Sequence, residues 1–184
     1  MKKALAGFIL KAAGWKITDN YPDYPRSICV MAPHTSMWDF VWGKLFFMYM
    51  GLKPYFLIKS EMFKWPLGPL LKAAGGIPVN RKNPAGLTGR LIADIKNKDR
   101  FLLVITPEGT RKKVDVWKTG VLRIAKRTGL PLIAGKVDYE TKELGLLAIY
   151  ENIPDDRNFI NELKMKFAGV TGKHPERFNP YAKQ

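Results

Sequence analysis

Cysteine is nearly absent from the 184-residue chain, in which Cys29 occurs alone. A single thiol excludes an internal disulfide framework and any Cys-x-x-Cys metal site. Cys29 lies in the short apolar run 27–31, and no neighbouring residue marks it as a low-pKa thiol. We interpret it as a small buried side chain and not as a nucleophile.

Long hydrophobic runs, repeats and low-complexity segments are also lacking. The longest apolar run, residues 40–52, contains Lys44 and is shorter than the roughly 20 residues that a membrane span needs. The N-terminal stretch is interrupted by Lys11 and Lys16, and no signal-peptide cleavage pattern follows it. We expect no transmembrane span, and a protein that is cytosolic or peripherally attached to the cytoplasmic face of a membrane.

Acidic residues are scarce, with 16 Asp+Glu against 31 Lys+Arg and a net charge of +15. Residues 1–16 carry +4, residues 52–82 carry +5 and residues 107–127 carry +5, which leaves +1 for all the others. Charge concentrated in this way indicates an anionic partner, such as a membrane surface, a phosphorylated substrate or nucleic acid. Nucleic acid is disfavoured, because no recognised motif is present and most aromatic residues lie in apolar runs.

The first basic window predicts an amphipathic helix within residues 1–18. Its apolar side chains fall within about 120° of one another on a helical wheel; they are Leu5, Phe8, Ile9, Ala12 and Trp15. Two interpretations stay open, because such a face can enter a membrane interface or dock on the protein's own core.

Short apolar runs alternate with helical segments along the rest of the chain. This alternation predicts a single α/β domain over residues 19–184, with a largely parallel mixed sheet flanked by helices. The expected strands are 27–32, 55–59, 77–80, 101–106, 132–137 and 144–150, and the expected helices are 37–50, 60–74, 85–97, 118–128 and 155–167.

Histidine is rare too, so imidazole chemistry falls to His34 or His174. His174 lies in a polar tail segment and is interpreted as solvated surface. His34 follows an expected strand and precedes an expected helix, with Asp39 five residues later. In one continuous helix the two side chains would point about 140° apart, but from a preceding turn the ring can fold back onto the carboxylate. Such a pair forms a general base, and Ser36 is expected to cap the helix instead of acting as a nucleophile.

Two further segments follow expected strands. Residues 106–113 combine Glu108, the conformationally free Gly109, the Thr110 hydroxyl and the Arg111 guanidinium, which suits phosphate. Residues 75–82 contain a glycine pair and end in basic residues, with Arg81 just after a short strand. Either segment alone could be an ordinary charged turn.

Taken together, these segments resemble the lysophospholipid acyltransferase family, which includes 1-acylglycerol-3-phosphate acyltransferases. His34 to Asp39 resembles that family's His-x4-Asp motif, and Pro107 to Arg111 matches its Pro-Glu-Gly-Thr-Arg core. Four other segments are similar to further family elements: 58–62 with 66–68, 76–81, 118–120 and 129–133. The resemblance covers residues 26–140.

The resemblance implies a glycerol-3-phosphate acyltransferase-like fold and an enzyme of phospholipid biosynthesis. Its acyl donor would be acyl-CoA or acyl carrier protein, its acceptor a lysolipid hydroxyl, and neither metal nor redox cofactor is implied. His34 would be the base and Asp39 its orienting partner. The acceptor and its phosphate would be bound by Lys59, Arg81, Glu108, Gly109, Thr110 and Arg111.

The sequence departs from the family's usual residues at Pro33, Asn80, Thr106 and Lys112. These departures leave the His–Asp pair intact but leave the acceptor open, so lysophosphatidic acid, another lysophospholipid and a lyso-aminolipid all remain candidates. An acyl thioesterase, in which water replaces the alcohol, also stays open. So does a non-catalytic basic protein that binds lipid or nucleic acid.

Overall fold

The computed structural model describes residues 2–80, 84–154 and 158–181. Seven strands form one sheet in the order β1-β7-β6-β2-β5-β3-β4. They are β1 (Lys16–Ile17), β2 (Arg26–Ala32), β3 (Pro54–Lys59), β4 (Gly76–Val79), β5 (Phe101–Ile105), β6 (Leu132–Asp138) and β7 (Glu143–Tyr150). All neighbouring pairs are parallel except β6 and β7, so the expected largely parallel, mixed α/β sheet is confirmed.

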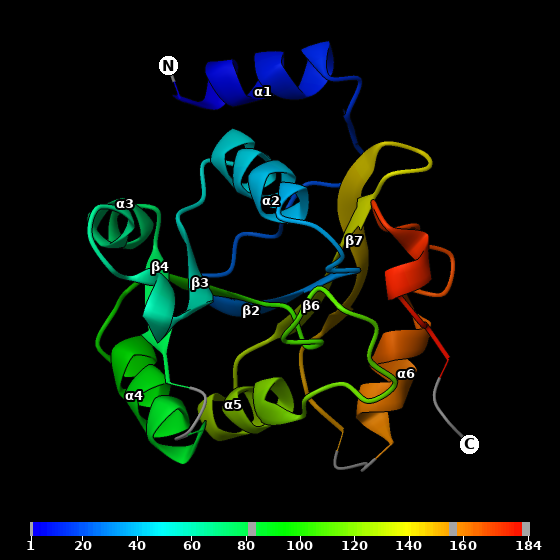
Figure 1. Ribbon diagram of the computed structural model, residues 1–184. Helices are drawn as coiled ribbons and strands as arrows, with labels where there is room; N and C mark the ends of the chain where they lie inside the picture. The colour runs from blue at the N-terminus through cyan, green and yellow to red at the C-terminus, as the bar shows by residue number, and fades with distance from the viewer. Residues whose placement is uncertain (1, 81–83, 155–157, 182–184) are drawn as a thin grey trace.

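Helices cover both faces of this sheet (Figure 1). Helices α1 (Lys2–Ala12) and α2 (Trp38–Tyr49) lie on one side, and α4 (Pro84–Lys96), α5 (Gly120–Thr128) and α6 (Phe159–Met165) on the other, while α3 (Leu67–Ala73) lies beside β4. Side chains alternate between the two faces along each strand. Ile28 and Val30 of β2 therefore enter the core under α4 and α5, whereas Cys29 and Met31 enter the core under α2.

The prediction of one helix over residues 60–74 was wrong. The segment is divided into a 3₁₀ turn, η1 (Ser60–Met62), and helix α3, which begins only after Pro66. Proline disfavours helical backbone in the residue before it. Gly68 then permits a close approach, because a Cβ there would lie 2.4 Å from the carbonyl oxygen of Phe63.

Helix α1 docks on the protein through a different stripe from the expected one. Ala6 and Leu10 are buried, while Leu5 and Phe8 remain 56% and 72% exposed. Trp15 is buried beyond the helix end, next to the short strand β1, which was not predicted from the sequence. The helix thus buries one narrow face against α2 and leaves part of its apolar surface exposed. No helix in the described residues has the length and apolarity needed to cross a membrane.

The parallel strands all end at the same edge of the sheet, where functional sites of such folds gather. The His34 turn (residues 33–39) follows β2, and the cationic loop (residues 109–113) lies beyond the end of β5. Because β2 and β5 are hydrogen-bonded neighbours in the sheet, these two segments start side by side.

Candidate active site

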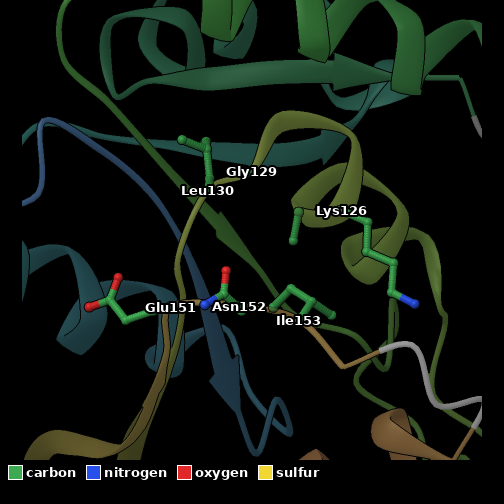
Figure 2. Close-up of a pocket in the computed structure, with 7 residues that line it drawn as sticks. Lys126, Gly129, Leu130, Glu151, Asn152 and Ile153 are labelled. Atoms are coloured by element: carbon green, nitrogen blue, oxygen red, sulfur yellow. The ribbon is translucent and has the colours of Figure 1, made fainter.

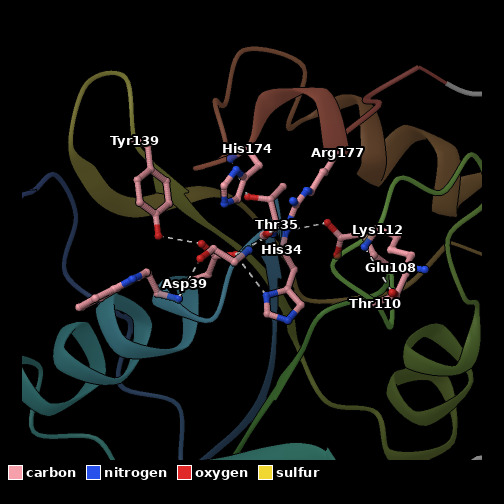
Figure 3. A network of polar contacts seen from close by, with 11 residues as sticks. His34, Thr35, Asp39, Glu108, Thr110, Lys112, Tyr139, His174 and Arg177 are labelled. Carbon is pink, nitrogen blue, oxygen red and sulfur yellow. Dashed lines mark hydrogen bonds and ion pairs between the residues drawn. The ribbon is translucent and has the colours of Figure 1, made fainter.

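The His34 turn brings the imidazole and the Asp39 carboxylate together. Helix α2 begins at Trp38, so His34 precedes it and its ring folds back onto the first helical turn (Figure 3). His34 Nδ1 lies 3.3 Å from Asp39 Oδ2, with the two side chains 20% and 6% exposed. A carboxylate at Nδ1 favours the tautomer that carries its proton there, which leaves Nε2 able to accept a proton.

Asp39 is held by three donors besides this imidazole. Its Oδ2 accepts the backbone N–H groups of Thr35 and Ser36 at 2.7 and 2.8 Å, and its Oδ1 accepts the Tyr139 hydroxyl at 2.7 Å. The Ser36 hydroxyl accepts the Trp38 N–H at 3.2 Å, but the N-cap position of α2 is Met37, so Ser36 contacts the start of the helix from one residue before the cap. The buried carboxylate is therefore well solvated by the protein and fixed in orientation.

Glu108 is buried behind the same turn. Its Oε1 accepts the backbone N–H of His34 at 2.8 Å, while the buried Oε2 has no hydrogen-bond partner among the described residues. Burial raises the pKa of Glu108 to about 7, although the hydrogen bond from His34 opposes this rise. Glu108 thus contacts the backbone of His34, a position that the sequence alone did not indicate.

The cationic loop begins with a tight turn. The N–H of Gly109 donates to the Thr106 carbonyl at 3.0 Å, and Gly109 has a φ of 63°, in the left-handed region that favours glycine. Thr110 is half-buried, and the cations that follow it, Arg111 to Lys113, are exposed. The loop presents positive charge next to the His34 turn (Figure 3).

The remaining expected binding residues lie at the ends of the outer strands. Lys59 is the last residue of β3 and is exposed at the same edge of the sheet. Arg81 lies outside the described residues, two positions after the end of β4. No contact among the described residues links Lys59 to the His34 turn directly.

Two segments late in the chain support the His34 turn, and neither was predicted from the sequence. Tyr139, in the turn between β6 and β7, reaches Asp39. In the C-terminal segment, the backbone N–H of His174 donates to the Thr35 hydroxyl at 3.2 Å and the Arg177 guanidinium donates to the Thr35 carbonyl at 3.4 Å. Because at least 100 residues separate these segments from the turn, no local signal could have found them.

Hollows among the described residues include one beside the candidate site and one away from it. One of about 300 Å³ lies beside the site and is lined mainly by aromatic side chains and two lysines: Ala13, Trp15, Trp38, Trp42, Tyr139, Lys142 and Lys173. Another of about 200 Å³ is lined by the end of α5, the turn that precedes β6 and the segment that follows β7 (Figure 2), at the opposite edge of the sheet from His34. Only the aromatic hollow shares a residue, Tyr139, with the candidate site.

The lone thiol has no part in this arrangement. Cys29 is fully buried within β2, and burial raises its pKa well above the usual range. The interpretation of Cys29 as a small core side chain is confirmed.

Comparison with known proteins points to the same family as the sequence motifs. The sequence model of the acyltransferase family matches residues 15–135. A 1-acyl-sn-glycerol-3-phosphate acyltransferase from Streptococcus pneumoniae is 30% identical over 113 residues, which are 59% of this chain and 40% of that relative. The aligned chain thus spans less than half the length of this relative.

A solved structure shares the fold. The crystal structure of the 1-acyl-sn-glycerophosphate (LPA) acyltransferase PlsC from Thermotoga maritima superposes with a TM-score of 0.60 at 18% identity, covering 91% of this chain and 74% of the other. The match to the family model covers most of the sheet and includes both the His34 turn and the cationic loop. This chain therefore belongs to the acyltransferase family.

Proposed function

We propose that this protein transfers a fatty acyl group from a thioester donor, acyl-CoA or acyl carrier protein, to the free hydroxyl of 1-acylglycerol-3-phosphate, a step of phospholipid biosynthesis. The observation that carries the proposal is the contact between His34 Nδ1 and Asp39 Oδ2 in a turn held from behind by Glu108. The similarity to the S. pneumoniae 1-acyl-sn-glycerol-3-phosphate acyltransferase supports the choice of acceptor.

In this mechanism His34 acts as general base and Asp39 stabilises the imidazolium that forms. Nε2 removes the proton from the acceptor hydroxyl while the oxygen attacks the thioester carbonyl. The tetrahedral intermediate collapses to the new ester and expels the thiolate, which takes the proton from the imidazolium. Direct attack needs no enzyme nucleophile, and in this structure the nearby Ser36 hydroxyl is already hydrogen-bonded to the start of α2.

The cations around the pair would bind the acceptor's phosphate. Arg111 offers a planar fork suited to phosphate oxygens. Thr110, Gly109, Lys59 and Arg81 are proposed to complete the acceptor site, with Glu108 holding the base. In this assignment the acceptor enters over the cationic loop, so its hydroxyl can reach the imidazole.

A product assay tests this proposal. Purified protein is incubated with labelled acyl donor and a panel of acceptors comprising lysophosphatidic acid, other lysophospholipids and a lyso-aminolipid, and products are identified by mass spectrometry. We expect phosphatidic acid as the main product. Thioester consumption that does not depend on an acceptor would instead indicate a thioesterase, and preferential acylation of the lyso-aminolipid would replace the proposed acceptor.

We further propose that α1 attaches the protein to an anionic membrane surface. Leu5 and Phe8 are exposed on a helix that also carries three lysines, a combination typical of interfacial helices. The variant L5Q/F8Q should sediment less with anionic vesicles than the wild type, while the control V116Q, which changes a residue that is 75% exposed elsewhere, should not. Equal sedimentation of the three proteins would contradict membrane attachment through α1.

A further inference from the structure

One side chain outside the motifs contacts the catalytic pair directly. The Tyr139 hydroxyl donates to Asp39 Oδ1 at 2.7 Å, on the carboxylate oxygen opposite the one that faces His34 (Figure 3). Tyr139 comes directly after β6 and lies beyond residues 15–135, which the family model matches. Tyr139 is therefore outside the segment that carries the family motifs.

Tyr139 is held in place by two other segments. Its backbone N–H donates to the Thr171 carbonyl at 2.9 Å, which ties the turn after β6 to the C-terminal segment. Its ring packs edge-on against Trp15, with centroids 5.2 Å apart and planes at 82°. A phenol fixed at both its backbone and its ring loses little further entropy when it donates a hydrogen bond, so the contact with Asp39 is preorganised.

The Tyr139 hydroxyl is protonated, as a hydrogen-bond donor must be. Burial and the neighbouring Asp39 carboxylate raise the pKa of Tyr139 well above its usual range, so the hydroxyl keeps its proton. The other titratable groups around the turn have other partners. Glu108 accepts the His34 N–H, and the Arg177 guanidinium donates to the Thr35 carbonyl. The His174 imidazole lies 3.8 Å from Glu176, and the Lys173 ammonium lies over the Trp38 ring, 5.0 Å from its centroid.

We propose that Tyr139 is a positioning residue of the His34–Asp39 pair, an inference that rests on the proposed acyl transfer. Its hydrogen bond turns the Asp39 carboxylate so that Oδ2 faces the imidazole, and it neutralises part of the carboxylate charge. A fully charged Asp39 would favour the imidazolium and would leave less neutral imidazole to accept the substrate proton. Tyr139 thus fixes the orientation of the Asp39 carboxylate and moderates its pull on the imidazole proton.

The variant Y139F tests this role, because it removes only the hydroxyl. The N–H groups of Thr35 and Ser36 still hold Oδ2, so the carboxylate stays near His34 with more of its charge exposed. We expect kcat at pH 7 to fall by roughly 10-fold or more with KM for the acceptor unchanged, and the acid limb of the pH–rate profile to move to higher pH. The control Y150F removes a hydroxyl from a half-buried tyrosine on β7 and should change neither quantity.

A double-mutant cycle separates positioning from a general structural effect. If Tyr139 acts through Asp39, the additional substitution Y139F should change the residual rate of D39N by less than about twofold. An equal loss in both backgrounds would overturn the proposal, and so would an unshifted acid limb in Y139F. A fall in Tm with unchanged kcat would also overturn it, since that result describes a packing residue only.

A nuclear magnetic resonance titration gives a readout that does not need turnover. The chain contains only two histidines, so the His34 signals can be assigned by comparison with H174Q. We expect the His34 titration to move to higher pH in Y139F, and an unmoved or lowered midpoint would overturn the proposal. If the wild type fails to transfer acyl groups, the proposed function fails, but this titration still decides whether Tyr139 acts on the pair.

Discussion

The His34 turn and the cationic loop begin on neighbouring strands but are built in opposite ways. In the His34 turn, Asp39 and Thr35 are buried, and their polar groups bond to α2, to the turn after β6 and to the C-terminal segment. In the cationic loop, Arg111 to Lys113 are exposed to solvent. Under the proposed function, proton transfer would use fixed groups, whereas phosphate binding would use side chains that can still adjust to their ligand.

The largest expected effect comes from a substitution in the His34 turn. The variant H34A removes the proposed base, and kcat should fall by roughly 10²- to 10⁴-fold, the usual contribution of a positioned base, with little change in KM. Steady-state kinetics measure both values, and an unchanged Tm shows that the fold survives. Retention of most of the wild-type kcat would remove His34 from the mechanism and with it the functional contrast between the two regions.

The second expected effect is on the pH dependence of stability. It arises because the Glu108 carboxyl is buried, unlike the exposed cations of the cationic loop. Its folded pKa of about 7 lies above the ordinary value of 4.5, so between these pH values the folded state holds a proton that the unfolded state has released. Stability is therefore lost as pH rises through this window. The unfolding free energy of the wild type should fall by roughly 3 kcal/mol relative to E108Q between pH 4.5 and 8.

Denaturant unfolding of both proteins across this range measures that difference directly. Glutamine keeps an oxygen that can accept the His34 N–H, so the hydrogen bond behind the base is retained. A difference that stays constant with pH would show that the Glu108 carboxyl titrates normally, as an exposed group would.

A third, smaller effect is expected in the cationic loop. R111A removes the proposed phosphate ligand, so KM for lysophosphatidic acid should rise by about 10-fold, with a smaller change in kcat. The rise should shrink at high salt, because exposed charges are screened. The control K53A removes one positive charge just before β3, at the opposite edge of the sheet, and should leave KM near the wild-type value. If R111A lowers kcat and leaves KM unchanged, Arg111 acts in the chemical step and not in binding the acceptor.

The smallest effect tests the turn that begins the loop. G109A should destabilise the protein by about 1 kcal/mol, because an L-residue pays a steric penalty at a φ of 63°. Gly89, inside α4, has no heavy atom within 4 Å of a built Cβ, and G89A should stabilise the protein by about 0.5 to 1 kcal/mol. Thermal unfolding compares the two variants, and equal shifts of the same sign would contradict the conformational argument.

Much of the fold could be predicted because each strand is a short apolar run between breaking residues. The five central strands and the helices over 38–49, 84–96 and 120–128 follow the predicted segments closely. The failures have physical causes. Pro66 interrupts the expected helix over 60–74, and the two-residue strand β1 has no hydrophobic pattern of its own.

For the site, the local sequence predicted that His34 and Asp39 meet, but it did not predict the distant residues that hold them in place. A turn before α2 was enough to predict that His34 meets Asp39, since the residues are five apart and one geometry brings them together. The contact of Glu108 with the His34 backbone crosses 74 residues, and that of Tyr139 with Asp39 crosses 100. No periodicity or spacing encodes such pairings.

The amino-acid sequence by itself determined the alternation of elements, the excess of positive charge and the order of the motifs, because these depend on neighbouring residues. Only the tertiary structure decided which face of α1 is buried, where the Glu108 carboxyl lies and which side chain donates a hydrogen bond to Asp39 Oδ1. Those outcomes depend on strand order and on desolvation, which arise when distant segments pack against one another.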